Sequence, residues 1–296
     1  MADTEGMLVH HETPSLRSPV MIAAFRGWND AGEAASFGAA HLERVWEAKA
    51  VASIDPEEFY DFQANRPTVH LVDGITREIT WPTNIFSAAH LPGAHHDVLL
   101  LRGNEPSTRW RTYSGLITDL AVRYDVQLVI TLGALLADVP HSRDIQITGT
   151  AVDQELIERL DLRRSRYEGP TGIVGVLHDA LGRARVPSAS LWAAVPHYLA
   201  VSPNPKAALA LVNKAAALVG ADADVGMLES AAASYDARVD EMVAEDEDIK
   251  AYVHLLEERA DGRAEDSMDQ IELPSGDAIA AELERFLQER REGEFD

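Results

Sequence analysis

The 296-residue chain contains no cysteine. Disulfide bonds, thiolate nucleophiles and cysteine-ligated metals are therefore excluded. The sequence also lacks any stretch near the roughly 18 consecutive apolar residues that suggest a membrane-spanning helix. Its first residues, MADTEGMLVHHE, are acidic and do not have the basic-then-apolar form of a signal peptide. We therefore expect a cytoplasmic protein without a membrane partner.

Positive charge is also scarce. The chain has 26 Lys and Arg against 49 Asp and Glu, a formal net charge of −23. Such a field repels phosphate backbones, so we predict no nucleic-acid partner. The acidic excess is concentrated beyond Gly220, where residues 221–296 hold 24 acidic and 7 basic side chains. This shift predicts a boundary between a domain of residues 1–220 and an acidic helical region of residues 221–296.

Signatures of several enzyme and cofactor classes are missing. The sequence has no G-x-G-x-x-G, no G-x-x-x-x-G-K-[ST], no G-x-S-x-G and no H-E-x-x-H. His95 and His96 adjoin, but no carboxylate is spaced to complete a metal site with them. We therefore predict no cofactor and no metal. The Gly-rich stretch YEGPTGIVG (167–175) fits either an ordinary helix start or a set of backbone N–H groups that hold an anion.

The sequence does contain an alternation of apolar runs and amphipathic stretches. Runs typical of buried strands cover residues 20–25, 50–54, 97–101, 126–133, 144–151 and 189–195. Helical periodicity covers residues 31–46, 107–124, 153–160, 172–184 and 204–219. Residues 67–73 and 76–82 flank a Gly-containing turn and predict a β-hairpin. This order predicts the α/β class, with a central, mostly parallel twisted sheet flanked by helices.

Polar and aromatic residues gather in the loops that follow the predicted strands or precede the predicted helices. In a parallel sheet these loops share one edge, where open α/β sheets place their ligand crevices. The residues brought to that edge are Trp28, Asn29, Asp30, Glu105, Arg109, Asp138, His141, Arg143, Tyr167, Glu168, His197 and Tyr198. Asp30, Glu105 and His141 have the side-chain types of general acids and bases. Arg109 and Arg143 suit an anionic ligand.

Structural roles stay open for the same residues. Asp30 and Glu33 have the spacing of a capping box. Glu105 precedes a proline and also fits a cap of the helix that follows it. His197 fits a hydrogen-bonded structural histidine as well as a ligand-binding one.

A set of motifs runs in order through the chain between Gly27 and Leu211. They are GWNDAGEAA, RPTV with REITWP, LLLRGNEPSTRW, LGALLADVPHSR, YEGPTGI and VPHYLAVSPNPKAALAL. Together they resemble the PAC2 family, named for proteasome assembly chaperone 2, and more narrowly its actinobacterial members. The acidic tail with ELPSGDAIAAELERFL is also similar to that group.

The resemblance implies an α/β fold like that of the nucleoside phosphorylases and hydrolases. It also implies a protein-binding role, because eukaryotic members of the family are non-catalytic chaperones that pair with a sister subunit and scaffold proteasome rings. Bacterial members have no settled function, and some carry the label of an ATP-grasp or carboxylate–amine ligase. This sequence shows neither a lysine-bearing Gly-rich loop nor a paired-carboxylate Mg²⁺ site.

The C-terminal region predicts a helical appendage. A stripe steps by four and three residues in turn and is apolar except at Asp246: Leu228, Ala232, Tyr235, Val239, Met242, Asp246, Ile249, Val253 and Leu256. We expect a bend or a break in EDED (245–248), a loop over 261–277, and a last helix capped by Ser275. The apolar face of that last helix holds Ile279, Ala280, Leu283, Phe286 and Leu287. The stripe fits a helical hairpin folded on its own domain or an interface with a subunit or partner.

Three functions follow from these observations. The first, which we favour, is a protein-binding, assembly-chaperone-like homo-oligomer, a trimer or dimer, with proteasome subunits as the candidate partner. The second is an enzyme or small-molecule-binding protein, similar to a hydrolase, phosphorylase or ligase, with a pocket at the carboxyl ends of the strands. There Trp28, Asn29, Tyr167, Glu168 and His197 would contact the ligand. The third is a purely structural oligomer whose loops serve subunit contacts.

Overall fold

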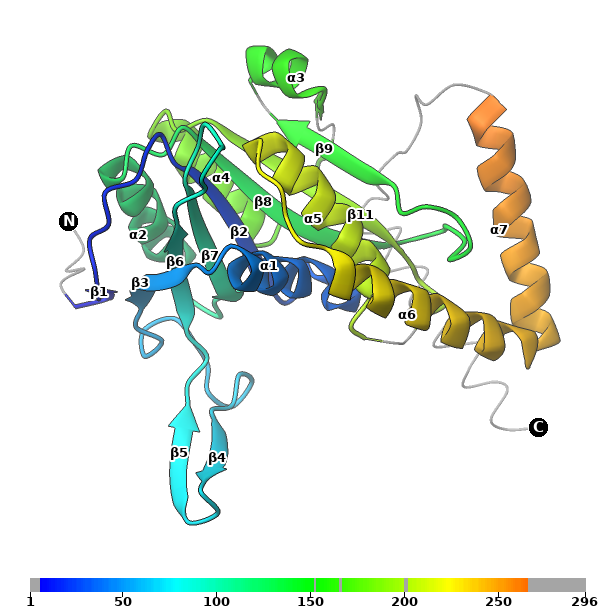
Figure 1. Ribbon diagram of the computed structural model, residues 1–296, viewed down its shortest axis with the longest axis horizontal. Coiled ribbons are helices and arrows are strands. Elements are labelled where there is room, and N and C mark those ends of the chain that lie inside the picture. Colours follow the sequence, from blue (N-terminus) through cyan, green and yellow to red (C-terminus); the bar gives the residue numbers. More distant parts are fainter. Residues whose placement is uncertain (1–5, 152, 165–166, 200–201, 266–296) are drawn as a thin grey trace.

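The computed structural model describes residues 6–151, 153–164, 167–199 and 202–265. Its centre is a nine-stranded sheet with the order β1-β3-β6-β7-β2-β8-β11-β9-β10. The strands of this sheet are β1 (Leu8–His10), β2 (Val20–Arg26), β3 (Lys49–Ile54), β6 (Asn84–Ala89), β7 (Val98–Asn104), β8 (Leu128–Ala137), β9 (Ile147–Ala151), β10 (Arg163–Arg164) and β11 (Ser188–Pro196). Figure 1 shows the sheet in the middle of the molecule with helices on both sides.

The centre of the sheet is parallel. β2 pairs in parallel with β7 on one side and with β8 on the other, and β8 pairs in parallel with β11. Antiparallel pairs join β7 to β6, β6 to β3, β3 to β1, and β11 to β9. The predicted α/β class is confirmed, as a mixed sheet whose four central strands all end at one edge.

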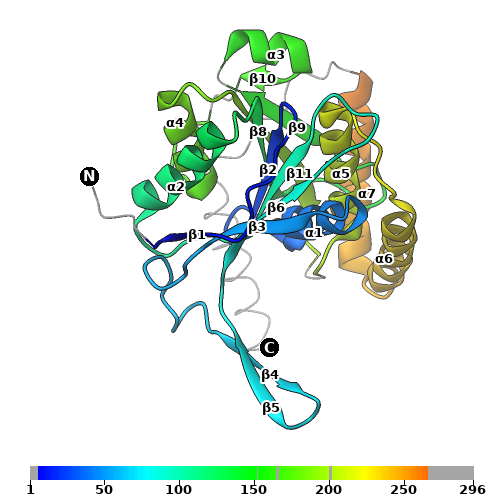
Figure 2. The same cartoon turned by 60° about the vertical axis from the view of Figure 1, so that its left-hand side comes forward.

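Helices cover both faces of the sheet. They are α1 (Ala34–Val45), α2 (Trp110–Arg123), α3 (Gln154–Leu160), α4 (Ile173–Arg183) and α5 (Pro205–Val219), and a short 3₁₀ turn, η1 (Ala31–Glu33), precedes α1. α1 packs with α5 on one face and α2 packs with α4 on the other, as Figures 1 and 2 show.

The sequence of β2 explains why both faces are covered. Val20, Ile22 and Ala24 join the apolar cluster under α1 and α5. The residues between them, together with Phe25, join the cluster under α2 and α4. Because successive side chains of a strand point to opposite faces, a strand covered on both sides is apolar throughout. The run VMIAAF therefore belongs in the middle of the sheet.

Three strands of the structure, β1, β6 and β10, were not predicted. β6 begins two residues after Pro82, and its sequence NIFSAA has a single β-branched residue. Its pairing with β3 and β7 holds it in place, and intrinsic strand propensity contributes little. Two predicted helices begin later than expected, since Glu33 and Arg109 have positive φ angles of 50° and 53°, which an α-helix does not accommodate.

The predicted hairpin is present as a separate two-stranded sheet of β4 (Thr68–Val72) and β5 (Thr76–Thr80). Asp73 and Gly74 turn the chain with φ angles of 53° and 71°, the left-handed values of a type I′ turn. Every residue of both strands is exposed. Figures 1 and 2 both show the hairpin projecting away from the rest of the molecule.

Two C-terminal helices, α6 (Gly226–Ala244) and α7 (Glu247–Glu265), follow the α/β body. The predicted break at 245–248 is confirmed. Asp246 interrupts the apolar stripe because its carboxylate begins α7, accepting hydrogen bonds from the backbone N–H groups of Asp248 and Ile249 at 2.9 and 3.1 Å.

The apolar stripe of α6 packs on the chain's own body. Leu228 belongs to the cluster under α1 and α5, and Tyr235 and Val239 form a smaller cluster with residues of α7 and of the loop after β11. Met242 does not share the buried side of the stripe: it is exposed, and Val243 is buried in its place. A helix turns every 3.6 residues, so a strict 4–3 stripe drifts off the buried side by the end of a long helix.

The predicted last helix, with Ser275, lies outside the described residues. The division into residues 1–220 and 221–296 stays a prediction. Within the ranges that the structure covers, no helix combines the length and the apolar character needed to cross a bilayer.

Candidate functional site

The parallel strands bring the predicted loops to one edge of the sheet. The backbone oxygen of Asn29, after β2, accepts a hydrogen bond from the N–H of Ala134 in β8 at 2.9 Å. Gly32 accepts one from the N–H of Asn204, before α5, at 2.7 Å. The loop after β2 is therefore joined through its backbone to β8 and to the loop after β11. Their polar side chains form two clusters, one around Glu105 and one around His141.

Glu105 lies at the end of β7, and its carboxylate faces the start of α4. Oε1 accepts a hydrogen bond from the backbone N–H of Ile173 at 2.7 Å and one from Nδ2 of Asn29 at 3.5 Å. Oε2 accepts one from the backbone N–H of Trp28 at 3.3 Å. A carboxylate in this position accepts a hydrogen bond from a free N–H group and interacts favourably with the positive end of the helix dipole. Glu105 therefore caps α4, and the expectation that it caps the helix following it, α2, is wrong.

Two glycines let the surrounding backbone approach this carboxylate. A Cβ atom on Gly172 would lie 2.5 Å from Nδ2 of Asn29 and 2.8 Å from Oε1 of Glu105. Gly27 has a φ of 138°, and a Cβ atom there would lie 2.9 Å from Cβ of Glu105. The glycines of GWND and YEGPTG thus serve one packed junction. Trp28, within it, keeps a side chain that is 59% exposed.

Asp30 is buried at the first turn of α1. Its Oδ1 accepts hydrogen bonds from the backbone N–H groups of Ala35 and Ser36 at 2.7 and 3.2 Å. The predicted capping box is wrong, because Glu33 has a left-handed backbone and its carboxylate pairs with Arg26 at 3.2 Å. The second oxygen, Oδ2, is buried without a hydrogen-bond partner among the described residues. Burial raises the pKa of this carboxyl.

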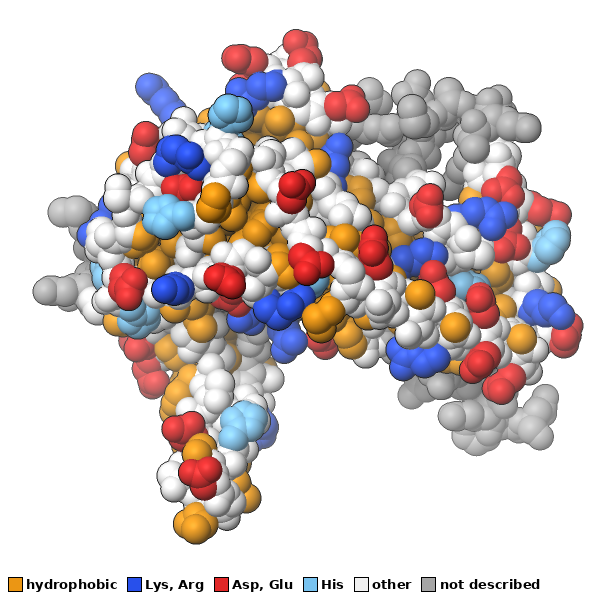
Figure 3. Space-filling view, in the orientation of Figure 1, with side chains coloured by type: hydrophobic (Ala, Val, Ile, Leu, Met, Phe, Trp, Pro, Cys, Tyr) orange, Lys and Arg blue, Asp and Glu red, His pale blue; other side chains and the backbone are white. Residues whose placement is uncertain are grey.

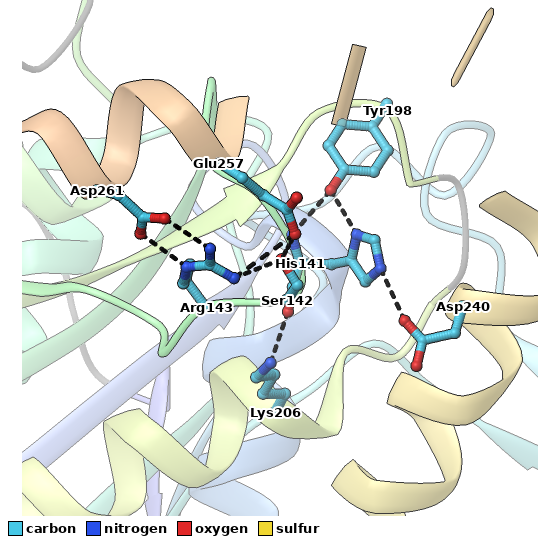
Figure 4. Close-up of polar contacts among 8 residues, drawn as sticks. All are labelled: His141, Ser142, Arg143, Tyr198, Lys206, Asp240, Glu257 and Asp261. Carbon is cyan, nitrogen blue, oxygen red and sulfur yellow. Dashed lines mark hydrogen bonds and ion pairs between the residues drawn. The ribbon is translucent and has the colours of Figure 1, made fainter. Parts of the chain in front are cut away.

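His141 follows β8 and is buried beneath the C-terminal helices (Figure 4). Its backbone N–H donates to the hydroxyl of Tyr198 at 2.7 Å, and its Nδ1 lies 2.7 Å from the same oxygen. Its Nε2 lies 3.1 Å from Oδ1 of Asp240 on α6, and its carbonyl accepts a hydrogen bond from Nζ of Lys206 on α5 at 2.6 Å. Each polar atom of His141 thus has a partner within the protein.

Arg143 connects the same loop to α7. Its Nε and Nη2 donate to the two carboxylate oxygens of Asp261 at 2.9 and 2.8 Å, a bidentate pair. Glu257 lies 3.5 Å from Nη1 of Arg143 and accepts a hydrogen bond from the hydroxyl of Ser142. The hydrogen bonds from Arg143 lower the pKa of the Asp261 carboxyl.

His197 belongs to this second cluster. Its Nδ1 lies 3.2 Å from Oδ1 of Asp138, and its Nε2 lies 3.4 Å from the hydroxyl of Tyr252 on α7. His141, Arg143 and His197 therefore lie together, and their contacts attach α6 and α7 to the carboxyl edge of the sheet.

Three further predicted residues stand in the loops before α2 and α4. Arg109 forms an ion pair with Glu58. The hydroxyl of Tyr167 donates to the backbone oxygen of Pro170 at 2.7 Å, in the loop before α4, and Glu168 beside it is exposed. The roles proposed from the sequence for these residues stay predictions.

Several members of the second cluster were not predicted: Lys206, Asp240, Glu257 and Asp261. Charged residues on helices are usually solvated, so residue type alone does not distinguish them. One signal was available, because Glu257 and Asp261 stand four residues apart and therefore share a helix face.

A surface cavity of about 650 Å³ lies at the other edge of the sheet. The C-terminal ends of α1 and α5 and the loop between β6 and β7 form it, and its lining includes Trp46, Leu91, Pro92, Ala217 and Ala221. Among residues 6–265 as described, no group of three or more His, Asp or Glu is arranged to hold a metal ion.

Comparisons with known proteins agree on a family. The PAC2 family model matches residues 24–243. A PAC2 family protein from Streptomyces avermitilis is 47% identical, covering 79% of this chain and 99% of its own, with a TM-score of 0.75. A proteasome-assembly chaperone homologue from Mycobacterium tuberculosis is 41% identical, covering 79% and 99%, with a TM-score of 0.72. No curated protein matches.

The fold extends to more distant proteins. PbaB of Pyrococcus furiosus, an archaeal proteasome activator, is 19% identical over 79% of this chain and 97% of its own, with a TM-score of 0.66. At that identity the likeness concerns the fold alone. The actinobacterial relatives confirm the resemblance inferred from the sequence motifs.

Proposed function

This chain is a member of the PAC2 family, and from that premise we propose that it is a protein-binding assembly factor working as a homo-oligomer, a trimer or dimer. The Mycobacterium tuberculosis relative is named a proteasome-assembly chaperone homologue. Proteasome subunits are therefore the candidate client, and the cytoplasm is the expected compartment.

The observation that carries the proposal is the apolar face of the β4–β5 hairpin. Val69 stands opposite Ile79 and Leu71 stands opposite Arg77, so these four side chains share one face. Val69, Leu71 and Ile79 are 57%, 63% and 58% exposed, and Ile75 at the turn is 86% exposed. Figure 3 shows apolar side chains along the hairpin and at its tip. A two-stranded hairpin is at best marginally stable in water unless its apolar face is covered.

An apolar arm of this kind fits a protein surface. Exposed apolar patches rimmed by polar residues mark interaction sites, and a projecting hairpin has no walls to enclose a small molecule. Burying an aliphatic side chain contributes roughly 1.5–3 kcal/mol. One hairpin with four such side chains barely offsets an association cost of about 4–15 kcal/mol. In a closed oligomer the same contact recurs in every copy, so the summed free energy of the contacts exceeds the cost of association.

The enzyme alternative has less support from the geometry. The carboxylate of Glu105 is committed to the backbone around α4, and the imidazole of His141 lies between Tyr198 and Asp240. Both arrangements hold elements of the fold together.

The test follows assembly directly. Purified proteasome α and β subunits from the same host are mixed with the chain, and native mass spectrometry follows ring formation. The arm variant is Val69→Thr/Leu71→Thr/Ile79→Thr, and the matched control is His70→Thr/Glu78→Thr on the opposite face of the hairpin. The proposal expects the wild type and the control to bind subunits or speed ring formation, and the arm variant to do neither. A wild-type chain without effect on assembly would overturn the chaperone role.

A further inference from the structure

The cavity at the amino edge of the sheet has a mixed lining, in which apolar side chains stand beside polar groups. Trp46, Leu91 and Ala94 are buried in its lining, and the exposed Pro92 and Ala217 stand at its rim. The indole Nε1 of Trp46 donates to the backbone oxygen of Asp222 at 2.9 Å, which ties the loop after α5 to the end of α1. A volume of about 650 Å³ lies within the range of protein binding sites and has room for several aliphatic side chains.

The chain's own hairpin does not reach this cavity. The hairpin precedes the first residue of β6, whereas the loop that lines the cavity follows its last residue. A six-residue strand spans roughly 20 Å, so the two features lie at opposite ends of β6. Figure 1 shows the hairpin pointing away from the sheet beyond the start of that strand.

The two surfaces complement one another in chemistry. The hairpin offers aliphatic side chains with one cation, Arg77, on the same face. The cavity offers the apolar side chains of Trp46, Leu91 and Ala94 beside polar groups that include two acids, Glu47 and Asp222. An aliphatic face carrying an arginine therefore finds both an apolar contact and opposite charge there.

We infer that the hairpin of one copy docks into the amino-edge cavity of a second copy of the same chain. The inference rests on the self-association proposed above and gives it a geometry. Because the hairpin and the cavity are different surfaces of one chain, two copies can exchange arms across a two-fold axis, or each copy can give an arm to one neighbour and receive one from another around a closed ring. The docking geometry therefore fits both the dimer and the trimer proposed above.

Cysteine cross-linking tests this geometry without background, since the chain has no cysteine of its own. Ile75→Cys places a thiol at the hairpin tip and Ala221→Cys places one in the cavity lining. The two single variants are purified, mixed, oxidised and separated on a non-reducing gel. The matched control pairs Ile75→Cys with Val122→Cys, an exposed position on α2, on the opposite face of the sheet from α1 and α5.

The inference expects a covalent dimer from the mixture with Ala221→Cys and none from the mixture with Val122→Cys. Ile75→Cys cross-linking to itself, or an oligomer that forms no Ile75–Ala221 bond, would overturn the docking geometry while leaving self-association intact. A monomeric wild-type chain would overturn both.

A second measurement does not depend on disulfide chemistry. Ala217→Glu places a carboxylate at the exposed rim of the cavity, and Asn213→Glu places one at an exposed position of the same helix outside it. The inference expects loss of the oligomer for Ala217→Glu alone, with the chain still folded as its circular dichroism shows. Equal oligomer content in both variants would contradict it.

Discussion

The carboxylate of Glu105 accepts a hydrogen bond at 2.7 Å from the backbone N–H of Ile173, a residue 68 positions further along the chain. Glu105 directly follows a central strand, β7, and Ile173 begins α4, so one side chain fixes the end of the sheet to the start of a helix on its face. This contact explains why the most unusual motifs of the sequence lie where a ligand crevice was expected.

Replacing Glu105 tests the cap. A hydrogen bond to a charged group contributes about 1.5–3 kcal/mol, so Glu105→Ala should lower the free energy of unfolding by that order in urea titrations. Glu105→Gln should lose less, because its amide oxygen still accepts from Ile173. Glu168→Ala, at an exposed position in the loop before α4, is the control. The cap is refuted if Glu105→Ala and Glu168→Ala unfold alike.

Gly172 should tolerate no side chain. Gly172→Ala would force its Cβ against Asn29 and Glu105, and overpacking of this kind costs about 1–3 kcal/mol. Gly182 in the same helix has nothing within 4 Å of a Cβ position. Gly182→Ala, at the next-to-last residue of α4, should therefore stabilise the chain by up to about 1 kcal/mol, since alanine loses less backbone freedom than glycine in a helix. If denaturant titrations show that the free energy of unfolding falls for Gly172→Ala and rises for Gly182→Ala, the junction is confirmed. A change in the same direction for both variants contradicts it.

Arg143 should control the attachment of α7 to the body. Arg143→Gln removes the bidentate pair with Asp261. Because the pair is exposed, global stability should change little, but backbone amides of α7 should exchange hydrogen faster. Added salt should have the same effect on the wild type. Lys250→Gln, which loses only a contact within α7, is the control. Unaltered exchange in α7 for Arg143→Gln would show that the apolar contacts alone hold the helix.

His178 should make stability fall in acid. Its Nδ1 lies 2.7 Å from the hydroxyl of Ser188 and its Nε2 lies 2.7 Å from that of Ser190, and burial lowers the pKa of its imidazole to about 4. Between about pH 6.5 and 4 the unfolded chain therefore binds a proton that the folded chain does not. The stability that this neutral histidine contributes is complete above pH 6.5 and is lost as the pH falls towards 4.

A shift of this size amounts to about 3 kcal/mol. The measurement compares the free energy of unfolding at pH 7 and pH 4 for the wild type, His178→Gln and the exposed control His95→Gln. His178→Gln should lose less stability between the two pH values than the other two proteins. An equal loss of unfolding free energy between pH 7 and pH 4 in all three proteins would contradict the role of His178.

The order of the strands and helices was predictable because each is set by local periodicity. β2 shows this most clearly, since a run of apolar residues permits only a central position. β6 was not predictable, because its pairing with β3 and β7 is a property of the sheet and its own sequence is weakly strand-like. That Val243 and not Met242 is buried on α6 was not predictable either, because the position of a helix on its neighbour decides which residue is covered.

The candidate site was predictable in part. Topology places Trp28, Asn29 and Glu105 together. The sequence indicates this, because these residues follow the carboxyl ends of predicted strands. The role of Glu105 was not predictable, because no local pattern links it to Ile173. Likewise, the partners of His141 and Arg143 on α6 and α7 depend on where those helices return to the body. The hairpin was predicted from its turn, but only the fold shows that its apolar face is left uncovered.

The central claim is that the uncovered face of β4–β5 joins copies of this chain, and the mass of the native particle in solution measures it most directly. Light scattering on the eluting wild-type protein should give a small multiple of 32.3 kDa, and the His70→Thr/Glu78→Thr control should match it. Val69→Thr/Leu71→Thr/Ile79→Thr should elute as a folded chain of 32.3 kDa. A wild type that stays at the mass of one chain at every concentration, or an arm variant that keeps the wild-type mass, would contradict the claim.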